Sequence, residues 1–208
     1  MTEWNAADYS RHSSLQEAMA QEVFALLDLK DSKRILDVGC GDGKITAEIA
    51  ARSPRGSVVW VDPSRDMIAF AQNHFSPATR PNLRFEIADA RSLPYKREFD
   101  LVVSFNALHW VPDQHAALAS IHSALISDGR AQLRLVVSGA RRSLEYVVEE
   151  TRRTSKWSAY FQDFHDPYLR LTSDEYAAMA KHNAFRVLDV ETRDHAWDFG
   201  SRAAFAAF

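Results

Sequence analysis

The sequence predicts an α/β fold, in which a doubly wound and mostly parallel β-sheet carries helices on both faces. Three observations support this prediction. Short runs of valine, isoleucine and leucine recur along the first two thirds of the chain, helical patterns stand between them, and a glycine-rich loop follows the first run. The 208 residues contain no internal repeat, low-complexity tract or long linker, so we expect one domain over residues 1–208.

The expected strands are short runs rich in valine, isoleucine and leucine, and most of them are of the kind that is buried on both faces of a parallel sheet. They are Ile35–Val38, Val58–Val61, Leu83–Ile87, Leu101–Ser104 and Gln132–Val137. The expected helices are Leu15–Leu27, Lys44–Ala51, Asp66–Phe75 and Asp113–Ile126, the last opened by Pro112. Because β-α-β crossovers are right-handed, helices cover both faces, and ligands bind beyond the carboxyl ends of the strands.

The alternation of strands and helices stops after Val137. Leu144–Thr154 is a charged helical stretch, Trp157–Tyr168 is aromatic and irregular, and "TSDE" is a capping sequence for a helix over Ser173–His182. We expect these inserted helices to form a lid over the ligand site. The domain then divides into a helical cover (1–30), a cofactor-binding core (31–138), a lid (139–183) and a C-terminal strand and helix (184–208).

The composition narrows the possible partners and the compartment. The formal net charge is −3, which gives no basic face for a phosphate backbone, so nucleic acid is not expected as a partner. The polar N-terminal segment has no apolar core of the kind found in a signal peptide, and no run of about 18 apolar residues indicates a membrane span. Cys40 is the single cysteine, so no internal disulfide forms. We expect a cytoplasmic protein, and read Cys40 as a small loop residue.

The sequence of the glycine-rich loop, "DVGCGDG", matches neither of two common nucleotide-binding motifs. A dinucleotide fingerprint needs a third glycine where Lys44 stands, and no Gly-Lys-Ser/Thr of a phosphate-binding loop is present. Gly39, Gly41 and Gly43 allow positive φ and a close approach of the backbone to a ligand. Asp37 precedes them, and its charge suits a cationic amino-acid group better than a phosphate.

Two further carboxylates follow the next two strands. Asp62 ends "VVWVD", where an acidic side chain can accept both hydroxyls of an unphosphorylated ribose. Asp89 ends the following strand, where it would accept from an adenine amino group while Met67 and Leu93 pack on the ring. The alternative for Asp89 is that it caps a loop. Together the three strand ends indicate a nucleoside site.

These segments resemble the cofactor motifs of class I S-adenosylmethionine-dependent methyltransferases, which occur in the same order over the first two thirds of the chain. The resemblance implies a Rossmann-like fold and S-adenosylmethionine as cofactor, with S-adenosylhomocysteine as product. It places Asp37 and the loop at the methionine part, Asp62 at the ribose and Asn106 beside the sulfonium. Trp60, two residues before Asp62, is a departure from the resemblance, because that family often has a small residue at this position. The expected cofactor contacts are Asp37, Gly39, Cys40, Gly41, Asp62, Pro63, Met67, Asp89, Ala90 and Asn106.

Three other segments, "WNAADYSRHSSLQ", "SFNALHWVPD" and "FQDFHDPYLRLTSDEYAAMAKHNAFRV", are similar to trans-aconitate methyltransferases. Juvenile hormone acid methyltransferases share the first two. Both families esterify carboxylates, so the resemblance implies a small organic acid as substrate. Gln16 and Trp110 match the pair that would hold the acceptor carboxylate. The full set of expected substrate contacts is Tyr9, Ser13, Gln16, His109 and Trp110.

A carboxylate acceptor is ionised at neutral pH, so methyl transfer to it needs alignment and a dry cavity rather than a general base. We therefore expect no acid–base residue and treat His109 as packed or hydrogen-bonded. Asp163, His165 and Asp166 lack further ligands, so no metal is expected. Other readings stay open: transfer to nitrogen, carbon or a phenolic oxygen, or a non-catalytic module that binds S-adenosylmethionine.

The size and charge of the acid stay open as well. A polycarboxylate would bind arginine side chains of the lid, and an apolar acid would bind its aromatic side chains. The sequence contains both kinds of residue. Phe185–Thr192 is expected to be a strand, and a helix starts at Ser201 with Phe205 and Phe208 on one face. Related methyltransferases continue beyond this helix and end with an antiparallel strand. We expect that strand to be missing from this chain, which would leave Phe185–Thr192 poorly paired or paired across a homodimer. A monomer is the alternative. Ala184 stands where the related families usually have glycine.

Overall fold

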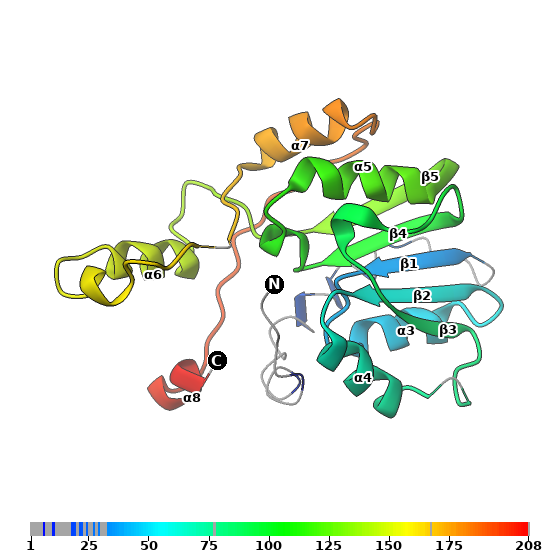
Figure 1. Cartoon of the computed structure of the whole chain (residues 1–208), viewed down its shortest axis with the longest axis horizontal. Helices are drawn as coiled ribbons and strands as arrows, with labels where there is room; N and C mark the ends of the chain where they lie inside the picture. The colour runs from blue at the N-terminus through cyan, green and yellow to red at the C-terminus, as the bar shows by residue number, and fades with distance from the viewer. Residues whose placement is uncertain are drawn as a thin grey trace.

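The computed structural model describes residues 33–76, 78–166 and 168–207, together with nine scattered residues before residue 33. Its core is a five-stranded, entirely parallel sheet with the strand order β3-β2-β1-β4-β5 (Figure 1). The predicted α/β class and parallel sheet are confirmed. The strands are β1 (Arg34–Val38), β2 (Ser57–Asp62), β3 (Leu83–Ile87), β4 (Phe99–Phe105) and β5 (Leu125–Arg134).

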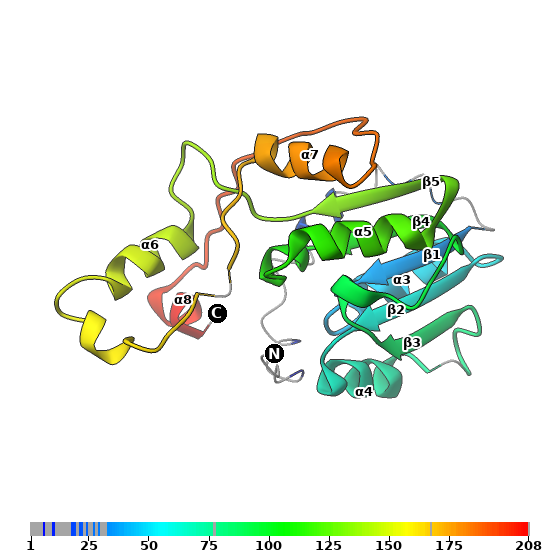
Figure 2. The ribbon, with the colours of Figure 1, turned by 45° about the horizontal axis from the view of Figure 1, so that its top comes forward.

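Helices lie on both faces of this sheet, as Figure 2 shows. Successive residues of each strand point to opposite faces, so Ile35 of β1 joins one apolar cluster and Leu36 joins the other. The first cluster packs against α3 (Lys44–Arg52) and α4 (Arg65–His74), and the second against α5 (Gln114–Ala124). The sheet is therefore doubly wound, and the strand order reverses between β1 and β4, where α/β folds bind ligands.

Side-chain caps fix where the helices begin. Ser64 accepts from the Met67 N–H at the start of α4, and Asp113 accepts from the Ala116 N–H at the start of α5. α7 (Ser173–His182) begins with the predicted capping box, in which Thr172 and Glu175 each accept from the other's backbone N–H.

Two predicted strand boundaries are wrong. The fifth strand spans Leu125–Arg134 rather than Gln132–Val137, because it starts directly after α5 and absorbs extra residues in a bulge, where the partner shifts from Phe99 to Leu101. Beyond Arg134 the chain leaves the ladder, and the Val136 N–H donates to the His109 ring.

The predicted strand Phe185–Thr192 is the second correction, since these residues form no ladder with any described segment. This agrees with the poor pairing expected for them, and pairing across a homodimer stays a prediction. Phe185 packs beside the second apolar cluster, but Leu188 and Val190 are exposed. A strand needs a neighbour that satisfies its backbone, and none of the described segments pairs with this one. Ala184, just before it, has φ +66°, a conformation that suits the glycine of related families.

The segment expected to be the lid forms an arm on the side of the sheet where the strands end (Figure 1). It contains α6 (Leu144–Arg152) and a short 3-10 helix, η3 (Ser158–Tyr160). The chain returns through a bridge between Ser138 and Thr172, and α7 then lies beside α5 (Figure 2). α8 (Arg202–Ala207) is the last described helix. Among the described helices, none has the length and apolar character that a membrane crossing requires.

Most of the predicted helix Leu15–Leu27 lies outside the described residues, and so do Tyr9, Ser13 and Gln16.

Candidate functional site

The loop between β1 and α3 has the conformation that its glycines allow. Gly39, Gly41 and Gly43 have φ values of +75°, +58° and +87°. A Cβ on Gly39 would lie 2.3 Å from the Cβ of Ala107, so a side chain there would collide with the loop after β4. The Gly39 N–H donates to the carbonyl of Val61 at 2.9 Å, which ties the loop to the end of β2. The backbone is therefore bare on the side where a ligand would approach.

Asp37 lies beneath this loop rather than in it. Its carboxylate is buried and accepts a hydrogen bond from the hydroxyl of Thr46, which stands on the first turns of α3. Burial raises the pKa of Asp37 to about 7, and repulsion from Asp62 adds to this effect while the Thr46 hydrogen bond opposes it. Burial, with the nearby carboxylates, also raises the pKa of the Cys40 thiol, so Cys40 stays protonated and unreactive.

The raised pKa of Asp37 predicts a pH-dependent stability. The folded protein holds a proton on Asp37 up to about pH 7, whereas the unfolded chain releases it near pH 4. The contribution to the free energy of unfolding is therefore full below pH 4 and is lost as the pH rises through 7. Denaturant unfolding at pH 5.5 and 8 should show this loss in the wild type and not in Asp37→Asn. Thr46→Val removes the opposing hydrogen bond and should extend the loss to higher pH; an unchanged pH dependence in Asp37→Asn would contradict the assignment.

Asp62 and Asp89 both stand where the sequence placed them, at the ends of β2 and β3, but their partners differ. Asp62 accepts from the Gly41 N–H at 3.2 Å and from the Ser64 N–H at 2.9 Å, so the backbone of two loops orients its carboxylate. Asp89 caps the short helix η1 (Ala90–Ser92) and forms an ion pair with Arg91, whose Nη2 lies 2.6 Å from Oδ2. The hydrogen bonds from Arg91 lower the pKa of Asp89. The structure thus shows the loop cap, and the expected hydrogen bond from an adenine amino group to Asp89 stays a prediction.

Most of the predicted residues line one large, open pocket (the cleft), which includes the carboxyl ends of the strands and extends along β5 and α7. Asp37, at the end of β1, and Cys40, within the loop, are both buried and do not line it, so their contact with a cofactor stays a prediction. Among the described residues, no cluster of His, Cys, Asp and Glu could hold a metal ion. The predicted residues that line the cleft are Gly39, Gly41, Asp62, Pro63, Met67, Asp89, Ala90, Asn106, His109 and Trp110.

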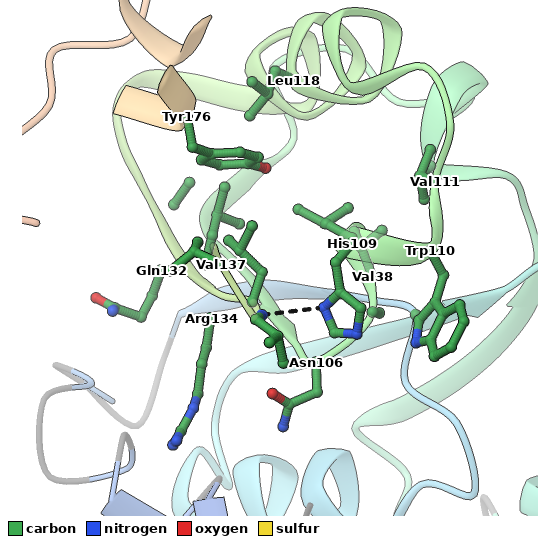
Figure 3. Close-up of a pocket in the computed structure, with 18 of the residues that line it drawn as sticks. Val38, Asn106, His109, Trp110, Val111, Leu118, Gln132, Arg134, Val137 and Tyr176 are labelled. Atoms are coloured by element: carbon green, nitrogen blue, oxygen red, sulfur yellow. Dashed lines mark hydrogen bonds between the residues drawn. The ribbon is translucent and has the colours of Figure 1, made fainter. Parts of the chain in front are cut away.

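The loop after β4 carries three of these residues, which Figure 3 shows around the cleft. Asn106 adopts φ +56°, a left-handed conformation that asparagine tolerates, and its Nδ2 is buried without a hydrogen-bond partner among the described residues. His109 and Trp110 belong to a single 3-10 turn, η2 (Leu108–Trp110). Trp110 remains 40% exposed, whereas His109 is buried.

His109 is held in its neutral form. Its Nδ1 accepts from the Val136 N–H at 3.3 Å, the bond drawn as a dashed line in Figure 3. Burial lowers the pKa of His109 to about 4. The bond to Val136 uses the lone pair of Nδ1, so the proton of the neutral ring lies on Nε2. A ring in this state donates a hydrogen bond at neutral pH and is a weak general base.

The structure adds residues that the sequence did not single out as site residues. Thr46 orients Asp37, and Arg134 lines the cleft from the end of β5, where it donates to the Met19 carbonyl and lies 3.5 Å from Glu22. Tyr176 of α7 enters the cleft from the opposite side (Figure 3). Of these residues, only Thr46 could have been found from the sequence, because it lies three residues after Gly43 in the first turn of the following helix.

The arginines of the arm are engaged by the arm's own acids and by a neighbouring one. Arg152 and Arg153 both contact Glu149 at 2.6 Å, Arg170 pairs with Asp166, and Arg142 pairs with Glu150. Arg141 lies 3.7 Å from Asp194. A polycarboxylate acceptor would have to displace these carboxylates. Exposed apolar side chains also line this part of the cleft; they are Leu144, Val147, Val148, Trp157, Phe161 and Phe164.

Comparison with known proteins gives one family and a set of similar chains. The family described as a methyltransferase domain matches residues 35–129. A putative methyltransferase of Invertebrate iridescent virus 6 is 25% identical over 99% of this chain and 75% of its own. A trans-aconitate 2-methyltransferase of Variovorax paradoxus is 35% identical over 62% of this chain and 48% of its own. The chain thus spans about half the length of that relative.

Solved structures show the same fold. A phosphoethanolamine N-methyltransferase of Haemonchus contortus, in complex with S-adenosyl-L-methionine, has a TM-score of 0.69 at 18% identity and covers 86% of this chain and 41% of that one. An S-adenosylmethionine-dependent methyltransferase of Mesorhizobium loti has a TM-score of 0.65 at 23% identity, with 85% of each chain covered. At these identities the likeness concerns the fold alone.

Proposed function

We propose that the protein is an S-adenosylmethionine-dependent methyltransferase that transfers the methyl group to the carboxylate of a small organic acid. The match of residues 35–129 to a methyltransferase domain and the similarity to trans-aconitate 2-methyltransferases support this proposal. The products are a methyl ester and S-adenosylhomocysteine. In this proposal Asp62 accepts from the ribose hydroxyls, Asp89, Ala90 and Met67 surround the adenine, and the glycine loop faces the methionine part. Asn106 lies beside the sulfonium.

The chemistry needs no proton transfer. A carboxylate oxygen attacks the methyl carbon while the carbon–sulfur bond breaks, and the electron pair of that bond stays on sulfur as the neutral thioether. Two opposite charges cancel, so the transition state is less polar than the reactants and gains from a cleft that excludes water. Alignment is then the main contribution of the protein, and it can reach about 7–11 kcal/mol. Trp110 and Gln16 would hold the carboxylate through neutral N–H donors.

The observation that best supports a carboxylate acceptor is the state of His109. A phenol or an ammonium group must lose a proton before it attacks. His109, the histidine beside Trp110, has its Nδ1 lone pair bound to Val136 and its pKa lowered to about 4, so it is a poor base for this step. A carboxylate is already ionised at neutral pH. A neutral imidazole N–H beside it would contribute a hydrogen bond without neutralising the nucleophile.

For the acid itself, two observations point in different directions. The trans-aconitate relatives support a polycarboxylate. The ion pairs of Arg141, Arg142, Arg152, Arg153 and Arg170, together with the apolar lining of the arm, support an acid with one carboxylate and an apolar remainder. We propose the second on the geometry of the arm, and the acceptor assay below includes both.

The proposal is tested with radiolabelled S-adenosylmethionine and a panel of acids that includes trans-aconitate, other di- and tricarboxylates, and apolar monocarboxylates. We expect label that alkali releases, because methyl esters hydrolyse whereas methyl groups on nitrogen or carbon persist. Apolar monocarboxylates should give the higher kcat/KM. Cofactor binding with no transfer to any acid would contradict the proposal and favour another acceptor or a binding module.

The pH dependence of the same reaction gives an independent check. With both substrates saturating, kcat should stay within about twofold between pH 8 and 9.5, above the pKa of about 7 of Asp37, because neither a carboxylate acceptor (reference pKa near 4) nor His109 titrates there. A tenfold rise in kcat per pH unit in this range would instead indicate that a base removes a proton from the acceptor.

A further inference from the structure

Tyr168 brings the arm into contact with the loop that carries Trp110. It belongs to the segment between η3 and α7, about 60 residues after that loop, and it is 8% exposed. Its ring stands perpendicular to the Trp110 indole, with the centroids 5.2 Å apart, and lies 4.9 Å from the His109 ring. The Leu169 N–H donates to the His109 carbonyl at 2.9 Å, so the backbones are joined at the same point.

Several contacts from the arm fix Tyr168. Its N–H donates to Asp166 Oδ1 at 3.0 Å, and the Arg170 guanidinium lies 5.3 Å from the centre of its ring. Arg170 pairs with Asp166 and donates to the Glu145 carbonyl of α6 at 3.3 Å. Arg170 and Asp166 thus link α6 to Tyr168, and the ring of Tyr168 in turn contacts Trp110.

The ring of Tyr168, rather than its hydroxyl, makes these contacts. The hydroxyl is buried and has no hydrogen-bond partner among the described residues. Trp110 is 40% exposed, so a large part of its indole is not fixed by burial. A ring packed edge-on against that indole limits its rotation, and such aromatic pairs contribute beyond the area that they bury.

We propose that Tyr168 is a positioning residue: its ring holds the Trp110 indole in the orientation that binds the acceptor. The proposal rests on the function proposed above, in which Trp110 contacts the acceptor carboxylate. It assigns the arm a role in the reaction, since Arg170 and Asp166 set where the Tyr168 ring lies.

Steady-state kinetics with the best acid of the panel separate the ring from the hydroxyl. Tyr168→Leu should lower kcat/KM for the acid by about 10- to 100-fold, because misalignment of a bound reactant costs rate, while the Kd for S-adenosylmethionine stays within about twofold. Tyr168→Phe keeps the ring and should recover most of this loss. Tyr146→Leu and Tyr146→Phe, on the surface of α6, serve as matched controls. Equal kinetics of Tyr168→Leu and the wild type would overturn the proposal.

A double-mutant cycle tests whether Tyr168 acts through Trp110. Trp110→Leu alone and Trp110→Leu with Tyr168→Leu should have the same kcat/KM, because the second substitution has nothing left to misplace. Additive losses would overturn the proposal, since Tyr168 would then act on the acceptor or the fold by another route. Arg170→Gln gives a milder variant should Tyr168→Leu not fold; its loss of kcat/KM should likewise vanish in the Trp110→Leu background.

Fluorine NMR of protein labelled with 5-fluorotryptophan tests the contact between Tyr168 and Trp110 without any measurement of activity. The chain has five tryptophans, and Trp110→Phe assigns the Trp110 resonance. This resonance should shift or broaden in Tyr168→Leu and stay in place in Tyr168→Phe; no change in Tyr168→Leu would overturn the positioning role. If the wild type methylates no acid but the resonance responds as expected, the proposed function fails while the contact between Tyr168 and Trp110 stands.

Discussion

Replacing Asp62 with asparagine is expected to weaken the binding of S-adenosylmethionine by about 10- to 100-fold, the loss of hydrogen bonds to a charged acceptor. The Asp62 carboxylate lies at the end of β2, beside the glycine loop, and the N–H groups of Gly41 and Ser64 orient it. A carboxylate has lone pairs for the ribose hydroxyls besides those two bonds. An asparagine has an NH2 group in place of one carboxylate oxygen. This group cannot accept a hydrogen bond, so either a backbone N–H or a ribose hydroxyl loses its acceptor. Isothermal titration calorimetry measures the effect directly.

Asp66→Asn is the matched control for this experiment. Asp66 carries the same charge four residues later, but it is exposed on the first turn of α4. Its substitution should leave the Kd within about twofold. If Asp62→Asn also binds the cofactor within twofold of the wild type, with an unchanged Tm, then Asp62 does not hold the ribose.

Gly43→Ala is expected to lower the free energy of unfolding by about 2–5 kcal/mol, which is large for a single methyl group. Gly43 has φ +87°, and its ideal Cβ would lie 1.1 Å from Cη2 of Trp60 and 2.0 Å from Cζ3. Trp60 cannot move aside, because it is fully buried and packs against Phe75 and Phe85. The left-handed backbone contributes ~1–2 kcal/mol of the loss and the overpacking ~1–3 kcal/mol. Urea denaturation monitored by circular dichroism gives the difference.

Two further variants separate these contributions. Gly139 has nothing within 4 Å of its ideal Cβ, so Gly139→Ala should change the stability by no more than about 0.5 kcal/mol. In a Trp60→Leu background, Gly43→Ala should cost only the backbone part. An equal cost of Gly43→Ala in both backgrounds would show that Trp60 does not set the limit at this position. The indole thus takes the space that a residue other than glycine would need.

Most of the core of the fold could be predicted because its signals are local. β1, β2 and β4 are rich in apolar residues, and α4 and α5 begin at side-chain caps that accept from a backbone N–H three residues later. Phe185–Thr192 has the composition of a strand as well, but a strand also needs a neighbouring backbone, and composition cannot supply one. The early start of β5 was missed for a related reason. Leu125 and Ile126 continue the apolar pattern of the preceding helix, and only the pairing of Leu125 with Phe99 shows that they belong to the strand.

The site could be predicted as far as strand ends determine it. Asp62 and Asp89 directly follow apolar runs, so a parallel sheet brings them to the same edge. Contacts between distant segments left no such signal. The orientation of Tyr168 against Trp110, the position of Arg134 in the cleft and the neutral tautomer of His109 all depend on how the arm and the end of β5 pack on the loop after β4.

A crystal structure of the protein soaked with S-adenosylmethionine would show whether the acidic ends of neighbouring strands bind a nucleoside donor. We predict the ribose hydroxyls within hydrogen-bond distance of Asp62, the adenine beside Ala90 and Met67, and the methionine part against the loop of Gly39 and Gly41. Density for the cofactor elsewhere, or a cleft that stays empty at saturating cofactor, would contradict this prediction.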